Sequence, residues 1–212
     1  GAWGISNNYD IFCAKGDFAG FWSIVQSYPG AFCTLAHPQS GDYGKLFSDT
    51  AGYHTIADNV SVGISVRSGS AFSTTTDYTD PPAASYESKF LAALAKGYHV
   101  GPTIDHDNHY TTFGRTNPSR TVVLSASLHR DSIMAAYKAN RFYASDDWNV
   151  KVNFTINGNF MGREFSTIDN SSISVSVYDP VLSSDDDDTT VNIEIYYGIP
   201  QSGINASILI SN

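Results

Sequence analysis

The sequence predicts an α/β domain over residues 1–146, followed by a small, sandwich-like antiparallel β domain over residues 147–212. Up to residue 146, short apolar runs typical of strands alternate with longer segments whose apolar residues recur every three or four positions. From Trp148 onward, apolar residues instead alternate with polar ones, and Asn157-Gly158 is a strong signal for a hairpin turn. This change of period predicts the boundary between the two domains.

The first domain is predicted to alternate strands and helices. Apolar residues recur at helical spacing over residues 17–28, where Asp17 is a candidate N-cap and Pro29-Gly30 ends the helix. Strands are expected on either side, over residues 6–12 and 31–36. A strand, a helix and a second strand joined by short connections predict a parallel βαβ unit.

The same alternation is predicted to continue to residue 145. Further strands are expected over residues 60–67, 100–107, 120–126 and 141–145, and further helices over residues 85–96 and 127–140. Residues 39–58 and 68–84 are expected to be loops, and a loop as long as 68–84 is typical of a lid or a binding segment. The second domain is expected to contain strands over residues 150–156, 172–178, 190–197 and 206–210.

The composition is that of a packed globular protein with a net acidic charge. Hydrophobic residues make up 42% of the chain, and the formal net charge is −9. The sequence shows no basic stripe, which disfavours a nucleic-acid partner, and no apolar run reaches the length of a membrane span. Many Asn, Ser and Thr residues with few lysines suggest a bacterial protein of the periplasm or the extracellular space.

Each of the two cysteines, Cys13 and Cys33, lies in an apolar run. Cysteine is often a small, buried hydrophobic residue in protein cores, so two buried free thiols on neighbouring strands are the favoured interpretation. A disulfide or a pair of zinc ligands is the alternative.

Residues 101–109 concentrate side chains that bind metal ions. On an extended backbone, Asp105, Asp107 and His109 would point to one side, and His106 would point to the other. Carboxylates and imidazoles that converge at the end of a strand are the ligands that Zn, Mn or Fe ions require. An ordinary polar loop, in which Asp and Asn residues form turns, is the alternative interpretation.

A further candidate ligand, His37, lies at the end of another predicted strand. The apolar residues 31–36 lead directly to His37, and Pro38 ends the strand. A histidine in this place strengthens the prediction of a divalent metal site.

Several separated segments carry a family resemblance. They are Leu35-Ala36-His37-Pro38, residues 95–102, Asp107-Asn108-His109, residues 119–124, residues 141–145, Ile156-Asn157-Gly158 and Met161-Gly162. In order and spacing they resemble the PHP (polymerase and histidinol phosphatase) family of metal-dependent phosphoesterases, in the metallohydrolase branch with a C-terminal β domain. The resemblance covers roughly residues 3–162 and implies the C-terminal part of a TIM-barrel-like fold, a distorted (β/α)7 barrel with metals at the C-terminal ends of its strands.

The resemblance implies a hydrolase that cleaves a small phosphate ester with a metal-activated water. His37, Asp107 and His109 would be metal ligands, and Asp107 and His109 would be the catalytic residues. Asp105 and His106 would hold ligands in position, with an ordinary loop role as the alternative for His106.

Two arginines of the same region are candidates for binding the phosphate of the substrate. Arg115 or Arg120 could donate to phosphoryl oxygens. A structural role in a loop or at the rim of the barrel is the alternative for both arginines, and for Arg120 it is the favoured interpretation.

The chain also departs from the family pattern. The first ligands of the family, a His-x-His among them, have no counterpart here, and Ala2 or Trp3 and Asn8 occupy places where a Glu and a His are expected. The chain is therefore expected to be either the C-terminal portion of a longer enzyme or a degenerate relative.

A different class of function is a non-catalytic scaffold whose β domain binds a carbohydrate or a protein. Trp148, Tyr196 and Tyr197 could line such a site, although core packing or strand pairing is the favoured interpretation for these aromatic residues. The sequence leaves open the substrate, the metal and the oligomeric state.

Overall fold

The computed structural model describes residues 2–3, 13, 16–39, 52–81, 84–166, 170–180 and 192–211. Its first part is mixed α/β and contains β1 (Ala2–Trp3), α1 (Phe18–Ser27), β2 (Phe32–Leu35), α3 (Thr55–Val60), β3 (Ser61–Ser68), β4 (Ala84–Ser85), α4 (Glu87–Lys96), β5 (Gly101–Asp105), β6 (Arg120–Val123), α5 (Arg130–Lys138) and β7 (Phe142–Ser145). The predicted strand over residues 6–12 lies outside the described residues.

A sheet of five strands organises this first part. β2, β3 and β5 run parallel, with β3 between the other two, while the two-residue strands β1 and β4 pair antiparallel with β2 and β3. β3 is buried along almost its whole length, as expected for a central strand covered on both faces. The predicted strand over residues 60–67 is thus the centre of the fold.

The main hydrophobic core lies between this sheet and three helices. It is built from residues of α1, α3, α4, β2, β3 and the connection between α4 and β5, namely Trp22, Val25, Cys33, Leu35, Ala57, Val60, Ile64, Ala93, Tyr98 and Val100. Alternate side chains of β2 point to the opposite face of the sheet, away from this core. There Phe32 stacks on Tyr137 of α5, with 5.6 Å between the ring centroids. Helices therefore cover both faces of β2.

Helix α3 was not predicted from the sequence. It has six residues and begins after His54, whose Nδ1 accepts a hydrogen bond from the Ala57 amide at 3.2 Å. A histidine cap is a weak sequence signal compared with Ser, Thr, Asp or Asn, and the helix runs into β3 without a turn. The prediction of a loop over residues 39–58 is therefore wrong for the last residues of that range, which belong to α3.

β6 and β7 form a separate antiparallel pair and do not extend the sheet as parallel barrel strands. The Thr121 side chain takes the place of backbone pairing between β5 and β6. Its hydroxyl accepts from the Ile104 amide at 2.8 Å and lies 3.2 Å from the Ile104 carbonyl oxygen. Among the described residues the strands form several small sheets and no closed barrel.

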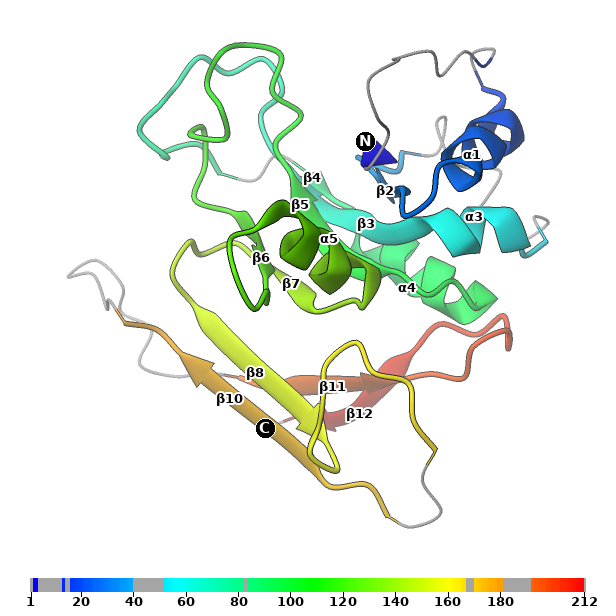
Figure 1. Cartoon of the computed structure of the whole chain (residues 1–212). Helices are drawn as coiled ribbons and strands as arrows, with labels where there is room; N and C mark the ends of the chain where they lie inside the picture. The colour runs from blue at the N-terminus through cyan, green and yellow to red at the C-terminus, as the bar shows by residue number, and fades with distance from the viewer. Residues whose placement is uncertain are drawn as a thin grey trace.

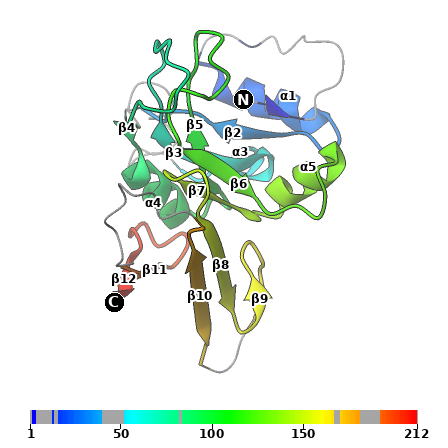
Figure 2. The same cartoon turned by 90° about the vertical axis from the view of Figure 1, so that its left-hand side faces the viewer.

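The last part of the chain contains only strands among its described residues. β8 (Lys151–Ile156), β9 (Asn159–Phe160) and β10 (Ile173–Tyr178) form one antiparallel sheet, and β11 (Glu194–Tyr197) and β12 (Ser207–Ser211) form another. Asn157 and Gly158 both have positive φ, which confirms the hairpin turn predicted between β8 and β9. These strands lie below the α/β part in Figure 1 and Figure 2.

Several predictions about individual side chains are corrected. Trp148, Tyr196 and Tyr197 are exposed, so core packing is wrong for all three. Strand pairing is confirmed for Tyr196 and Tyr197, which pair with β12. Cys33 is buried as predicted, but Cys13 is exposed, and both thiols are free. Among the described residues, no helix has the length and the apolar character needed to cross a membrane.

Candidate metal centre

The candidate site forms where β2 and β5 end. The two strands are parallel and both pair with β3, so their carboxyl ends lie at the same edge of the sheet. His37 follows β2 by two residues, Asp105 is the last residue of β5, and Asp107 comes two residues later. This edge of an α/β sheet is where ligands bind in most α/β proteins.

Asp105 connects the two strand ends across β3. Its Oδ2 accepts a hydrogen bond from the His37 backbone amide at 2.9 Å. The loop that follows β5 packs closely on Gly69, directly after β3, where a Cβ would lie 2.8 Å from Asn117 Nδ2 and 3.0 Å from the His106 carbonyl oxygen. The Gly69 amide also donates to the Asp105 carbonyl at 2.9 Å, which fixes the start of the loop that follows β5.

The side chains of His37 and Asp107 meet at this crossing. His37 Nε2 lies 3.6 Å from Asp107 Oδ1, and each side chain is about one-third exposed (33% and 31%). Two ligands on one tetrahedral zinc ion lie roughly 3.4 Å apart, given metal–ligand distances of about 2.0–2.2 Å. The pair therefore has the spacing of two ligands of a single metal ion.

His109 has the tautomer of a metal ligand but does not complete the group. Its Nδ1 lies 2.7 Å from the Asp107 carbonyl oxygen, so Nδ1 donates and Nε2 keeps its lone pair, as is common in metal-binding histidines. The ring packs on Phe72 at 4.6 Å between centroids, and the side chain is exposed. Within the described part of the chain, no three His, Cys, Asp or Glu side chains are grouped closely enough to hold a metal ion.

His106 has a structural position, and Asp105 has the position of a residue that orients a ligand. His106 Nε2 lies 2.9 Å from the Ser119 carbonyl oxygen and must donate to it, so Nδ1 can only accept from the Thr116 hydroxyl at 3.4 Å. His106 therefore holds the loop over residues 116–119 and contacts none of the three predicted ligands in a hydrogen bond.

The two candidate arginines differ in how many of their guanidinium N–H groups already donate hydrogen bonds. Arg120 Nη1 donates to the carbonyl oxygens of Asn117 and Ser119 at 3.0 and 2.6 Å, and the group lies over the Tyr78 ring at 5.3 Å. Arg115 is exposed, and among the described contacts it is engaged only through its Nε, at a long distance of 3.4 Å from the Thr112 carbonyl. Arg115 therefore has more of its five N–H donors left for a phosphate than Arg120.

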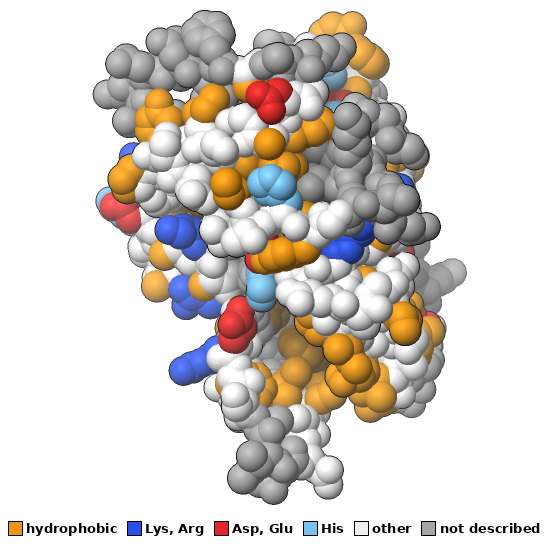
Figure 3. Space-filling model, turned by 90° about the vertical axis from the view of Figure 1, so that its right-hand side faces the viewer, with side chains coloured by type: hydrophobic (Ala, Val, Ile, Leu, Met, Phe, Trp, Pro, Cys, Tyr) orange, Lys and Arg blue, Asp and Glu red, His pale blue; other side chains and the backbone are white. Residues whose placement is uncertain are grey.

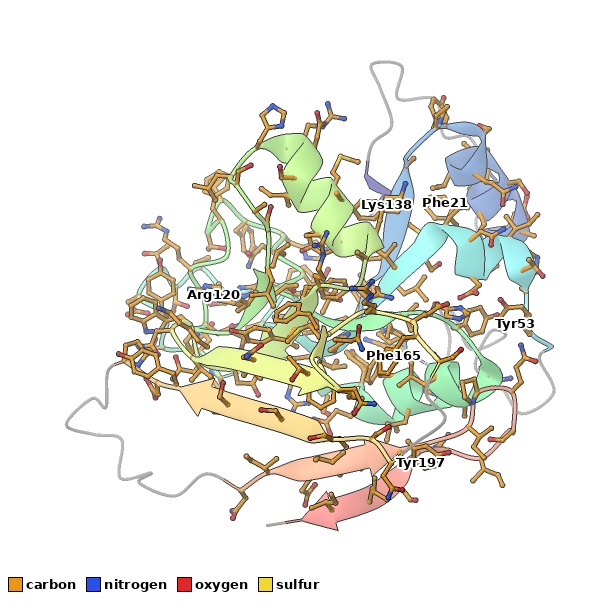
Figure 4. The ribbon with its side chains drawn as sticks, turned by 60° about the horizontal axis from the view of Figure 1, so that its bottom comes forward. Phe21, Tyr53, Arg120, Lys138, Phe165 and Tyr197 are labelled. Atoms are coloured by element: carbon orange, nitrogen blue, oxygen red, sulfur yellow. The ribbon has the colours of Figure 1, made fainter. Side chains whose placement is uncertain are left out.

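A mainly apolar pocket of the described residues lies away from the candidate site. It has a volume of about 640 Å³ and lies between α4 and the segments around Met161 and Ile199. Its lining is mainly apolar, and Figure 3 shows the hydrophobic side chains that gather around a hollow on this side. Figure 4 shows Tyr53 on the opposite side of the molecule from Arg120. We place the candidate site at the strand ends because side chains able to perform chemistry converge there.

A carboxylate–histidine pair at the rim of this pocket was not predicted from the sequence. Asp58, whose side chain is 8% exposed, accepts from the His99 amide at 2.7 Å and contacts His99 Nδ1 at 2.8 Å. It also accepts from the Tyr53 hydroxyl at 2.5 Å, a bond that raises the pKa of Tyr53 to about 12. No sequence pattern links residues 41 positions apart, so only the structure could show this pair.

Comparisons of the chain with protein-family models, with curated protein sequences and with solved structures found no match.

Proposed function

We propose that this chain is a metal-dependent phosphoesterase of the PHP type, or the C-terminal portion of one. The observation that supports the proposal is the meeting of His37 and Asp107 at the carboxyl ends of parallel strands, 3.6 Å apart and braced by Asp105. The α/β part would then belong to a distorted barrel of that family.

Each residue of the candidate site has a defined task in this proposal. His37 and Asp107 would bind a Zn, Mn or Fe ion, and His109 would bind through Nε2 once its side chain, which is exposed, turns toward them. Asp105 would keep the His37 backbone in place. The bound metal would supply a water of lowered pKa and a clamp for phosphoryl oxygens. Arg115 would bind the phosphate of a small ester.

The first test measures the metal content of the purified full chain by elemental analysis. We expect about one tightly held divalent ion per chain, lost in the variant His37→Ala/Asp107→Asn. His129→Ala is the matched control, because this histidine is 72% exposed and lies at the start of α5. Metal that persists in the double variant would contradict the assignment of these ligands.

Hydrolysis is measured with 4-nitrophenyl phosphate in the presence of Mn²⁺, Zn²⁺ or Fe²⁺. We expect His109→Ala to reduce turnover by about 100-fold, the upper end of the roughly 10–100-fold range found when a residue that supports a metal site is removed. Turnover in His109→Ala equal to that of the unaltered chain would rule out His109 as a catalytic residue. If the native reading frame extends upstream, the longer protein is assayed alongside.

A binding function of the C-terminal strands is the second candidate. The supporting observation is the exposure of large apolar and aromatic side chains on β10, β11 and β12, with Tyr178, Tyr197 and Leu209 all more than half exposed. A pull-down or a glycan array with and without residues 147–212 tests this candidate. Binding that survives the deletion would rule out these strands as the binding surface.

A further inference from the structure

A second hollow lies beside the candidate metal centre, with a lining of a different kind. It is formed by Thr74, Thr76, Asn108, His109, Tyr110, Thr111, Thr112 and Phe113, and its volume is about 600 Å³. We call it the threonine hollow. Its residues come from the loops that follow β3 and β5, which lie side by side at the upper left of Figure 1.

Backbone hydrogen bonds hold the two loops together, so the walls of the threonine hollow are fixed in advance. The His109 amide donates to the Ala71 carbonyl at 2.9 Å, and the Tyr78 amide donates to the Arg115 carbonyl at 2.9 Å. Within the second loop, Asn108 Oδ1 accepts from the Gly114 amide at 2.9 Å. A preformed pocket loses little conformational entropy when a ligand binds.

Two aromatic side chains of the threonine hollow are exposed at a cost in free energy. Phe113 is 83% exposed and Tyr110 is 52% exposed. Phe113 also has a φ of 49°, a left-handed conformation that a bulky side chain rarely adopts. A strained and solvent-exposed phenylalanine contributes little to folding, and such residues cluster at binding sites.

Buried polar groups of the threonine hollow have no partner among the described residues. Thr112 is 3% exposed, and its hydroxyl makes no hydrogen bond there. The same is true of the buried Asn108 Nδ2. Buried polar atoms are nearly always hydrogen-bonded, so these two groups indicate a ligand or a bound water that has hydrogen-bonding groups of its own.

The lining selects the chemistry of the ligand. None of the described residues that line the threonine hollow is Asp, Glu, Lys or Arg, so a charged ligand body has no partner among them. Four threonine hydroxyls and one amide can both donate and accept, and the two aromatic rings offer flat apolar faces. We propose that the threonine hollow binds a sugar ring, with its apolar face on Tyr110 or Phe113 and its hydroxyls toward the threonines.

His109 belongs both to the threonine hollow and to the candidate metal centre. On the proposed function, the ring would therefore be the leaving group of a sugar phosphate whose phosphate points toward His37 and Asp107. Binding of the ring itself does not depend on hydrolysis, so it can be measured in a protein without activity.

The experiment measures saturation-transfer NMR of methyl glucoside, methyl galactoside and methyl mannoside with the full chain. We expect saturable binding of at least one glycoside, weakened about threefold to tenfold by Phe113→Ala or by Tyr110→Ala. The matched control is Leu128→Ala, because Leu128 is 96% exposed and does not line the threonine hollow. Absence of binding for all three glycosides at tens of millimolar would overturn the proposal.

A second variant separates a binding role from a folding role. Thr112→Val keeps the shape of the side chain and removes only its hydroxyl, so the midpoint of thermal unfolding should not fall. Glycoside binding should weaken about threefold to tenfold. A lower unfolding midpoint with unaltered glycoside binding would mean that the Thr112 hydroxyl serves the fold, and would overturn its assignment to the sugar.

Hydrolysis distinguishes this inference from the proposed function. If glycosides bind while neither glucose 6-phosphate nor glycerol 2-phosphate is hydrolysed, the sugar site stands and the phosphoesterase proposal fails. If both esters are hydrolysed and Phe113→Ala lowers kcat/KM equally for the two, the sugar site is overturned and the phosphoesterase proposal stands.

Discussion

Replacing Asp105 by Ala tests how the candidate site is held together. The Asp105 carboxylate accepts the His37 amide at 2.9 Å and so ties the end of β2 to the end of β5. His37 itself has a φ of 29°, which is unfavourable for a residue with a side chain. We expect the substitution to leave the His37 amide without its acceptor and to release this strained turn.

The expected loss of stability follows from the type of bond. Hydrogen bonds to charged groups contribute about 1.5–3 kcal/mol. Asp105 and His37 are both partly exposed, so water can reach the broken pair, and we expect a loss of about 2 kcal/mol. In a chain of this size that loss lowers the midpoint of thermal unfolding by roughly 4–8 °C. Asp105→Asn keeps an oxygen acceptor, so we expect about half of the effect.

Asp107→Asn is the matched control, measured by thermal and urea unfolding followed by circular dichroism. Among the described contacts, the Asp107 carboxylate reaches only His37, at 3.6 Å, and Asn tolerates the φ of 48° at this position. We expect a stability within about 0.5 kcal/mol of the unaltered chain. Metal content should show the opposite order, with the larger loss in Asp107→Asn. If Asp107→Asn destabilises as much as Asp105→Ala, the division of roles between the two carboxylates is refuted.

Two further predictions concern thiols and alkaline pH. Cys13 is exposed, whereas Cys33 is fully buried and burial raises its pKa. Ellman's reagent should therefore label one thiol quickly and the second only as the chain unfolds. Two fast thiols, or a fast phase that remains in Cys13→Ser, would contradict this prediction. The pKa of Tyr53 is raised to about 12 because its protonated hydroxyl donates to Asp58, so this bond stabilises the fold fully below pH 10 and is lost as the pH rises through 12. Tyr53→Phe should therefore lower the stability measured by urea unfolding at pH 8. The difference in stability from the unaltered chain should shrink by pH 12. A difference that stays constant would show that deprotonation of the Tyr53 hydroxyl does not remove the contribution of this bond.

The strands and helices that follow from local pattern are those the sequence could predict. β3 was recognisable because Val62, Ile64 and Val66 alternate with small residues, and α4 because Gly97, at a φ of 97°, ends a regular helical pattern. Helix α3 was missed because it is short and is capped by His54. The antiparallel pairing of β6 with β7 depends on contacts between distant residues, which sequence periodicity does not encode. The division into two domains at residue 146 stays a prediction.

The candidate site was predictable in part for the same reason. The position of His37 and Asp107 at strand ends follows from the pattern of the flanking strands, and the structure brings the two together. The task of His106 could not be predicted, because its partners Thr116 and Ser119 are reached through a loop whose path depends on Gly69. The ligand roles of the three residues, and the family they resemble, stay predictions.

Backbone strain offers an independent argument that this edge of the sheet is built for binding. Seven described residues other than glycine have positive φ, and four of them, His37, Tyr78, Asp107 and Phe113, belong to the loops at this edge. Asn140 and Asn157 lie in turns, where asparagine adopts this conformation readily. Histidine and aspartate also adopt it more often than most residues, but tyrosine and phenylalanine gain nothing comparable. Each residue held in this strained conformation costs about 1 kcal/mol or more of folding free energy, and the surrounding hydrogen bonds keep it in place. A loop that served only to connect strands would have no need of such residues, so their concentration favours a site over an ordinary turn.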